Sequence, residues 1–186
     1  MKTLIDQTYF CREINLPEVG NPIAGDLVCK FIDKYEPRYL VESLGYAFAK
    51  QFLEGLGVEP TDQRWLDLLN GCEWQDKKGN VLYFEGLRNS VTKVSPIANY
   101  VYYFYVRSRN SDTAMVGEVR AKTENSYRIT PAEKMVNAWN DMVAWTRSMW
   151  YFLERSVNGD GDRVYPEFCV WKQMPTHFQS INSFGI

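Results

Sequence analysis

The sequence predicts a mainly α protein: a bundle of four to five helices with one small β-hairpin, a long inter-helix loop and an extended C-terminal tail. Three observations support this prediction. Apolar residues recur at helical spacing through most of residues 24–157, separated by capping and stop signals. Only residues 72–86, approximately, contain two short strand-like runs, which flank the turn signal Lys78-Gly79-Asn80. The residues after about 158 show no periodicity and include two prolines.

The chain has 186 residues, enough for one well-buried domain and short for two. We expect an N-terminal arm over residues 1–22, a helical bundle over 23–157 and an extended tail over 158–186. Within the bundle, the hairpin occupies about 72–86 and a loop or arm about 110–129. A net charge of -2 argues against general nucleic-acid binding, which needs a basic excess.

The expected compartment is a cytoplasm. The N-terminal residues lack the apolar core and cleavage site of a secretory signal, and the longest apolar run is far below the roughly 20 residues of a membrane span. The sequence has four cysteines, with no CxxC pair. We expect them to be reduced and mostly buried: Cys11, Cys29, Cys72 and Cys169.

The first two helices follow from periodicity. Apolar residues recur at helical spacing from Ala24, and Pro37 is expected to end or kink that helix near Glu36. A second helix continues to about Leu56, where glycines stop it. A short third helix begins after a cap at Thr61 or Asp62 and closes on Gly71.

The stretch ANYVYYFYVRSR, residues 98–109, is rich in tyrosine and fits a membrane contact, a base-stacking platform or a protein core. Ser95 and Pro96 precede it as N-cap and first helical residue, which predicts a helix. As a strand it would be apolar on both faces, which belongs to parallel sheets. We therefore expect a central, nearly all-round buried helix whose exposed end carries Arg107 and Arg109. Base stacking is the lesser alternative.

The segment after this helix is long and has no helical period. Residues 117–124 alternate charged with apolar or small side chains, the period of a strand. Such a strand either adds to the edge of another chain or lies on its own domain. The next helix has the clearest signal, because Thr130, Pro131 and Glu133 form a capping box with proline at the first position. It should run to about Val157.

Few residues suggest chemistry. Asn158, Asp160 and Asp162 imitate the start of a calcium loop, but Arg163 and Cys169 replace the required glycine and glutamate, so a polar turn is expected. His177 lies in the irregular tail with no nucleophile partner in view. The spacing of five acidic residues suggests solvated faces: Glu13, Glu18, Glu36, Glu42 and Glu118. We expect no enzyme activity, no catalytic residue, no metal and no cofactor.

Five motifs in order carry a resemblance across about residues 26–153: FIDKYEPRYLVESLGYAFAKQF, WLDLLNGCEW, SPIANYVYYFYVR, VGEVRAKTEN and KMVNAWNDMVAW. They resemble a family of proteins encoded by tailed phages and prophages of Bacteroidetes hosts. In size and helical layout that family resembles head–tail connector (adaptor) proteins, small helical subunits that form a ring beneath the portal. Connectors carry a long loop between their last two main helices, and residues 110–129 occupy the matching place. The resemblance brings no catalytic residues.

The resemblance implies a structural virion subunit, present in the host cytoplasm during assembly and at the head–tail junction afterwards. Its expected partners are further copies of itself in a ring, twelve by resemblance, the portal protein and the next tail or ring protein, without membrane or sequence-specific nucleic-acid contact. The alternative is a cytoplasmic adaptor or regulatory helical domain with one protein partner. The residues expected to contact another subunit or the portal are Met115, Val116, Glu118, Val119, Arg120, Lys122, Trp171, Phe178, Phe184 and Ile186.

Overall fold

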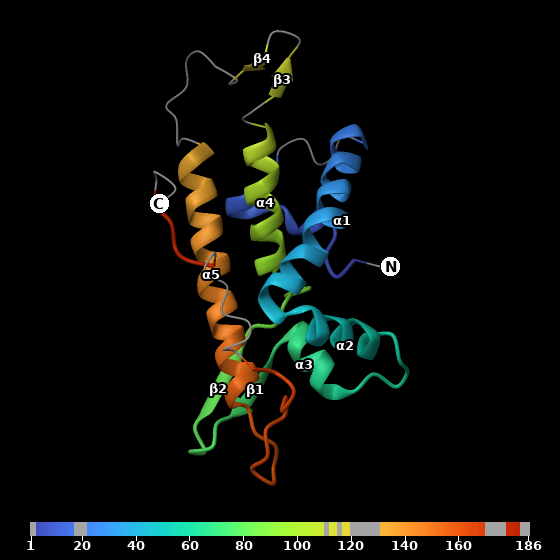
Figure 1. Cartoon of the computed structure of the whole chain (residues 1–186), viewed down its shortest axis with the longest axis vertical. Coiled ribbons are helices and arrows are strands. Elements are labelled where there is room, and N and C mark those ends of the chain that lie inside the picture. The colour runs from blue at the N-terminus through green and yellow to red at the C-terminus, as the bar shows by residue number, and fades with distance from the viewer. Residues whose placement is uncertain are drawn as a thin grey trace.

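The computed structural model describes residues 3–16, 22–109, 112–114, 117–119, 131–169 and 178–182. Three long helices, α1, α4 and α5, lie side by side with α4 in the middle (Figure 1). The predicted mainly α fold with a small hairpin is confirmed. In chain order, the elements of these residues are η1 (Gln7–Tyr9), η2 (Arg12–Ile14), α1 (Pro22–Leu44), α2 (Tyr46–Leu56), α3 (Gln63–Asn70), β1 (Cys72–Gln75), β2 (Val81–Phe84), α4 (Pro96–Arg109), β3 (Asp112–Ala114), β4 (Gly117–Val119) and α5 (Pro131–Arg155).

Helix α1 continues through Pro37, so of the two outcomes expected at this proline, an end or a kink, an end of the helix near Glu36 is wrong. Interior proline removes one backbone hydrogen bond and costs about 3 kcal/mol. The helix nevertheless continues because Tyr39, Leu40 and Leu44, two, three and seven residues beyond the proline, are at most 1% exposed in the core. The break comes instead at Gly45, whose φ of 78° is readily adopted only by glycine.

The short helix α3 and the hairpin agree with the sequence signals. The Asp62 carboxylate accepts a hydrogen bond from Arg64 N, and Gly71 follows the last helical residue with a φ of 86°. Strands β1 and β2 pair antiparallel, with Cys72 opposite Phe84 and Gln75 opposite Val81. The hairpin rests on α5 through its inner face, where Phe84 stacks on Phe152 and Trp74 meets the same ring edge-on.

Two glycines meet where the hairpin begins and ends. Gly86 has a φ of 82°, and a Cβ added there would overlap the backbone of Asn70 and Gly71. We expect Gly86→Ala to lower the free energy of unfolding by about 3 kcal/mol, from the left-handed backbone and the overlap together. Urea denaturation measures this loss. Gly79→Ala is the matched control, because Gly79 has a φ of 80° but nothing within 4 Å of an added Cβ. It should cost only about 1 kcal/mol, and equal losses would contradict the close approach.

Helix α4 begins as predicted. Ser95 Oγ accepts from Ile97 N at 3.1 Å and donates to Leu87 O at 2.7 Å, which caps the helix and ties it to the end of the hairpin. The expectation of nearly all-round burial holds only for its first half. Residues 103–106 are half-buried and 107–109 exposed, toward the end of the bundle from which the chain continues to β3 and β4 (Figure 1).

Helix α5 also follows its sequence pattern, ending at Arg155 rather than about Val157. The capping residue Thr130 lies outside the described residues. Residues at steps of three and four along α5 form a mainly apolar stripe that packs against α4 and α1. Its members that are at most 1% exposed are Met142, Val143, Thr146, Met149 and Leu153.

The N-terminal arm is part of this core rather than a separate extended segment. Its described residues form two short 3₁₀ helices, η1 and η2, and its apolar pairs belong to the same buried cluster as the residues of the long helices. The buried residues of the arm are Leu4, Ile5, Tyr9 and Phe10. Apolar pairs in segments too short to form a full α-helix are therefore sufficient to hold the arm on the bundle.

Candidate functional site

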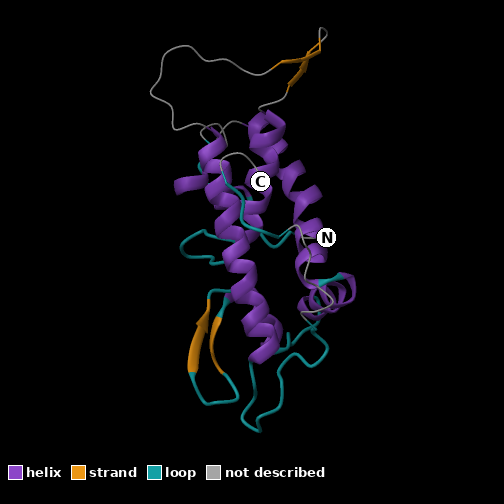
Figure 2. Ribbon diagram, turned by 60° about the vertical axis from the view of Figure 1, so that its left-hand side comes forward, coloured by secondary structure: helices purple, strands orange, loops and turns teal. Residues whose placement is uncertain are grey.

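The connection between α4 and α5 contains most of the residues expected to make subunit contacts. The structure describes two of its segments, β3 and β4, which pair antiparallel with Thr113 opposite Glu118 and Asp112 opposite Val119. The expectation that residues after 117 form a strand is confirmed for Gly117–Val119. Both views place this hairpin beyond the ends of α4 and α5, at the opposite end of the molecule from β1 and β2 (Figures 1 and 2). The remaining contact candidates of this segment lie outside the described residues: Met115, Val116, Arg120 and Lys122.

The tail supplies the other expected contacts, and the structure corrects one of them. Phe178 is only 3% exposed within its own chain, and its ring lies between those of α1, α4 and α5. It is therefore not available on the surface for a neighbouring subunit. The four rings around it, with centroids 6.0–6.3 Å away, belong to Tyr39, Tyr100, Trp139 and Trp150. Trp171, Phe184, Ile186 and the chain's single histidine, His177, lie outside the described residues.

Polar contacts hold the same segment of tail on α5. The Trp139 indole N–H donates to Gln179 O at 2.8 Å. The Asn140 amide donates to Ile181 O at 2.9 Å and accepts from Ile181 N at 2.8 Å. The reciprocal pair imitates one rung of a β-ladder, so residues 178–182 are attached to their own domain.

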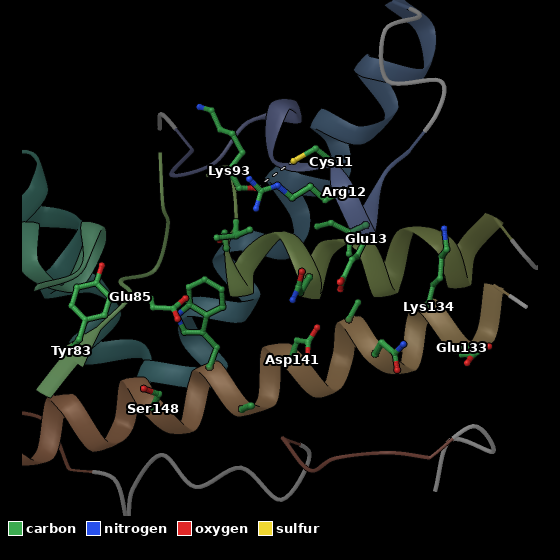
Figure 3. Close-up of a pocket in the computed structure, with 18 residues that line it drawn as sticks. Cys11, Arg12, Glu13, Tyr83, Glu85, Lys93, Glu133, Lys134, Asp141 and Ser148 are labelled. Atoms are coloured by element: carbon green, nitrogen blue, oxygen red, sulfur yellow. Dashed lines mark hydrogen bonds between the residues drawn. The ribbon is translucent and has the colours of Figure 1, made fainter. Parts of the chain in front are cut away.

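A groove of about 1130 Å³ lies between η2, the start of α4, the outer face of α5 and the end of β2 (Figure 3). On one wall, Cys11 Sγ lies 3.7 Å from Lys93 O, a contact in which the thiol donates. The lining mixes both signs of charge, with Arg12, Lys93 and Lys134 among the cations. A groove with such a lining is better suited to contact a polar surface of another molecule than to bind an apolar ligand.

Two carboxylates approach each other across this groove, Glu13 from η2 and Asp141 from α5 (Figure 3). Partial burial raises the pKa of Asp141, and the charge of Glu13 raises it further. Among the described residues that line this groove there is no histidine.

Glu36 is the most unusual acidic residue, and the expectation that it lies on a solvated face is wrong. It is 5% exposed. Its carboxylate accepts from Leu4 N at 2.9 and 3.0 Å and from Ile5 N at 3.2 Å. Arg88 Nη1 donates to Leu4 O at 2.7 Å, so both sides of that peptide are held. Burial raises the pKa of Glu36 to about 7, against the opposing effect of the two backbone N–H groups.

Glu42 is likewise engaged rather than solvated. It accepts from Arg38 Nε at 2.7 Å and from the Tyr100 hydroxyl at 2.7 Å, which connects α1 to α4. Burial, followed by the nearby carboxylate, raises the pKa of Tyr100. The sequence did carry a signal for Glu36, because Val28, Ile32, Glu36 and Leu40 follow one another at four-residue steps and place the glutamate in the apolar stripe.

The calcium-like segment forms a polar turn, as expected. Asn158 Oδ1 accepts from Asp160 N and Asp162 N, so the side chain closes the turn that follows α5. Among the residues with described placement, no group of three or more histidine, cysteine or acidic side chains is arranged to hold a metal ion.

The cysteines are free thiols, as expected, but they are not mostly buried. Cys29 is exposed and the other three are half-buried. Cys29 is exposed because it follows the buried Val28 on the next face of α1.

No protein-family model, curated protein or solved structure matches this chain. No described helix is both long enough and apolar enough to cross a membrane.

Proposed function

We propose that the chain is a subunit of a head–tail connector ring of a tailed phage, seated between the portal and the tail. The supporting observation is the β3–β4 hairpin, carried on the connection between the two central helices at one end of the bundle (Figure 1). A cyclic ring needs a heterologous interface, in which two different patches on each subunit meet. An arm that leaves the bundle between two rigid helices provides one such patch.

The arm can reach a neighbour without disturbing the core. In the described part of the chain, α4 packs extensively against both α5 and α1, whereas β3 and β4 pack chiefly against each other. The proposed contact set in this arm keeps the residues named from the sequence, with Glu118 and Val119 in β4.

Replacing residues 110–129 by a Gly/Ser linker of about eight residues tests this role and keeps the capping residue Thr130. The variant is expected to keep the thermal midpoint of the wild type, because it keeps every helix, and to be missing from particles when it replaces the phage's own copy. Virion purification and immunodetection measure this. The matched control is Lys77→Ala with Lys78→Ala, exposed residues at the tip of the other hairpin, which should leave incorporation unchanged.

Absence of the wild-type protein from purified virions would overturn the connector proposal, and incorporation of the linker variant would overturn the role of the arm. If the linker variant does not fold, Glu118→Lys with Arg120→Glu decides the question by reversing the charges of the arm. Deleting residues 171–186 is not a clean alternative, because it removes Phe178 from the core.

A further inference from the structure

Strand β2 has an open edge. In the described part of the chain it pairs only with β1, whereas the other edge of β1 bridges to Val157. Edge strands expose unpaired N–H and C=O groups and usually carry a charge or a proline that blocks further pairing. Residues 81–84 read VLYF, which contains neither.

The register shows which backbone groups face that edge. Asp76 N donates to Asn80 O at 3.1 Å, so by the alternation of antiparallel ladders the Trp74–Leu82 and Cys72–Phe84 pairs are the hydrogen-bonded ones. Val157 N donates to Gln75 O at 3.1 Å, which agrees with this assignment because Gln75 then faces away from β2. The N–H and C=O groups of Val81 and Tyr83 therefore point outward from the hairpin.

The side chains on this edge are apolar and solvent-exposed. Val81 is 62% exposed and Tyr83 is 61% exposed, both on the outer face of the sheet, while Phe84 on the inner face is 1% exposed. β-Branched and aromatic side chains stabilise a sheet when they lie opposite one another on neighbouring strands. Within one copy, however, Tyr83 lies opposite Glu73 and Val81 opposite Gln75.

We propose that β2 pairs antiparallel with β2 of a second copy, centred on Leu82, so that two hairpins form one four-stranded sheet across a two-fold axis. This register places Val81 opposite the partner's Tyr83 and Tyr83 opposite the partner's Val81. All the outward N–H and C=O groups of both residues then find partners, and each exposed aliphatic side chain packs on a tyrosine.

Charge complementarity supports a second copy as the occupant. The same register places Glu85 opposite Gly79, in the partner's turn, which carries the exposed Lys77 and Lys78. Because the contact is isologous, it closes after two copies and does not build a ring. The proposed dimer is therefore a state of the free protein. Its contact surface lies at the opposite end of the molecule from β3 and β4 (Figure 2).

A cysteine substitution tests the register directly. In the proposed pair, the two copies of position 82 form a non-hydrogen-bonded pair with Cα atoms about 4.5 Å apart, within the range that a disulfide spans. Mild oxidation of Leu82→Cys should give a covalent dimer linked at position 82. Peptide mass spectrometry identifies it as two joined copies of the tryptic peptide 79–88, which contains none of the native cysteines.

Two matched controls follow from the same register. Val81→Cys alone and Tyr83→Cys alone should not link to themselves, because their copies lie more than about 7 Å apart. A mixture of the two variants should link position 81 to position 83. If folded Leu82→Cys yields no linked peptide, or if the single variants link as readily as the mixture, the proposal is overturned. If Leu82→Cys fails to fold, the mixture of Val81→Cys and Tyr83→Cys tests the register in its place.

Sedimentation of the wild-type chain gives an independent measurement. Dimerisation should depend on concentration, and Val81→Lys with Tyr83→Lys should weaken it at least tenfold. Val91→Lys is the control, an 88% exposed valine away from this edge, and should leave the dimer unchanged. A dimer unaffected by the lysine pair, or a wild type that stays monomeric, contradicts the proposal. These results do not depend on whether the protein enters virions.

Discussion

Replacing Tyr100 by alanine is expected to lower the free energy of unfolding by about 3–5 kcal/mol, the loss typical of a buried aromatic residue. Tyr100 is 1% exposed at the point where α1, α4, α5 and the tail meet. Urea denaturation followed by circular dichroism measures the loss. The rings that would lose their partner belong to Tyr35, Tyr39, Phe104, Trp139 and Phe178.

Two variants separate the parts of this effect. Tyr100→Phe keeps the ring and removes only the hydrogen bond to Glu42, which is expected to cost about 1.5–3 kcal/mol because the acceptor is charged. Tyr103→Ala truncates a half-buried neighbour on the same helix and should cost about 1 kcal/mol. A Tyr103→Ala loss as large as that of Tyr100→Ala would contradict the placement of the core on the first half of α4.

Glu36 is expected to make stability fall as pH rises from about 4.5 to about 7. The folded-state pKa of this carboxyl is raised from 4.5 to about 7, mainly by burial. The stability that the neutral carboxyl contributes is therefore fully present below pH 4.5, where the group is protonated in both the folded and the unfolded protein. It is lost as pH rises through 7, where the folded protein must hold a buried charge. A shift of this size corresponds to roughly 3 kcal/mol.

The difference between wild type and Glu36→Gln isolates this group from others that titrate in the same range. Glutamine stays neutral and keeps an oxygen that accepts from Leu4 N and Ile5 N. We expect the free energy of unfolding of Glu36→Gln, relative to that of the wild type at the same pH, to increase between pH 4 and pH 8. A difference that is independent of pH would show that the carboxyl titrates normally. Asp76→Asn is the control, since the pKa of Asp76 is lowered, chiefly by hydrogen bonds from Asn80, and the group stays ionised over this range.

The elements that the sequence predicted well are those with local signals. Asp62 and Gly71 mark both ends of α3, and Ser95 with Pro96 marks the start of α4. A cap depends on a few neighbouring residues, so its signal is present in the sequence whatever the rest of the fold does. The long apolar stripe of α5 is local in the same sense.

The misplaced features depend on contacts between distant residues. Whether Pro37 ends its helix depends on how firmly the core holds Tyr39 and Leu40, and this is not a local property. The burial of Glu36 needs Leu4, and the burial of Phe178 needs the aromatic rings of three helices. For the candidate contacts in the arm, the sequence identified the segment and its strand, and the partner remains a proposal.

The position of Phe178 also has a consequence for the order in which the chain folds during synthesis. A polypeptide is made from its N-terminus, and domains begin to fold as they leave the ribosome. Tyr39, Tyr100, Trp139 and Trp150 all precede Phe178 by many residues, yet its ring completes the space between them. Until residue 178 emerges, the nascent chain exposes an unfinished aromatic surface, the kind of surface that chaperones bind.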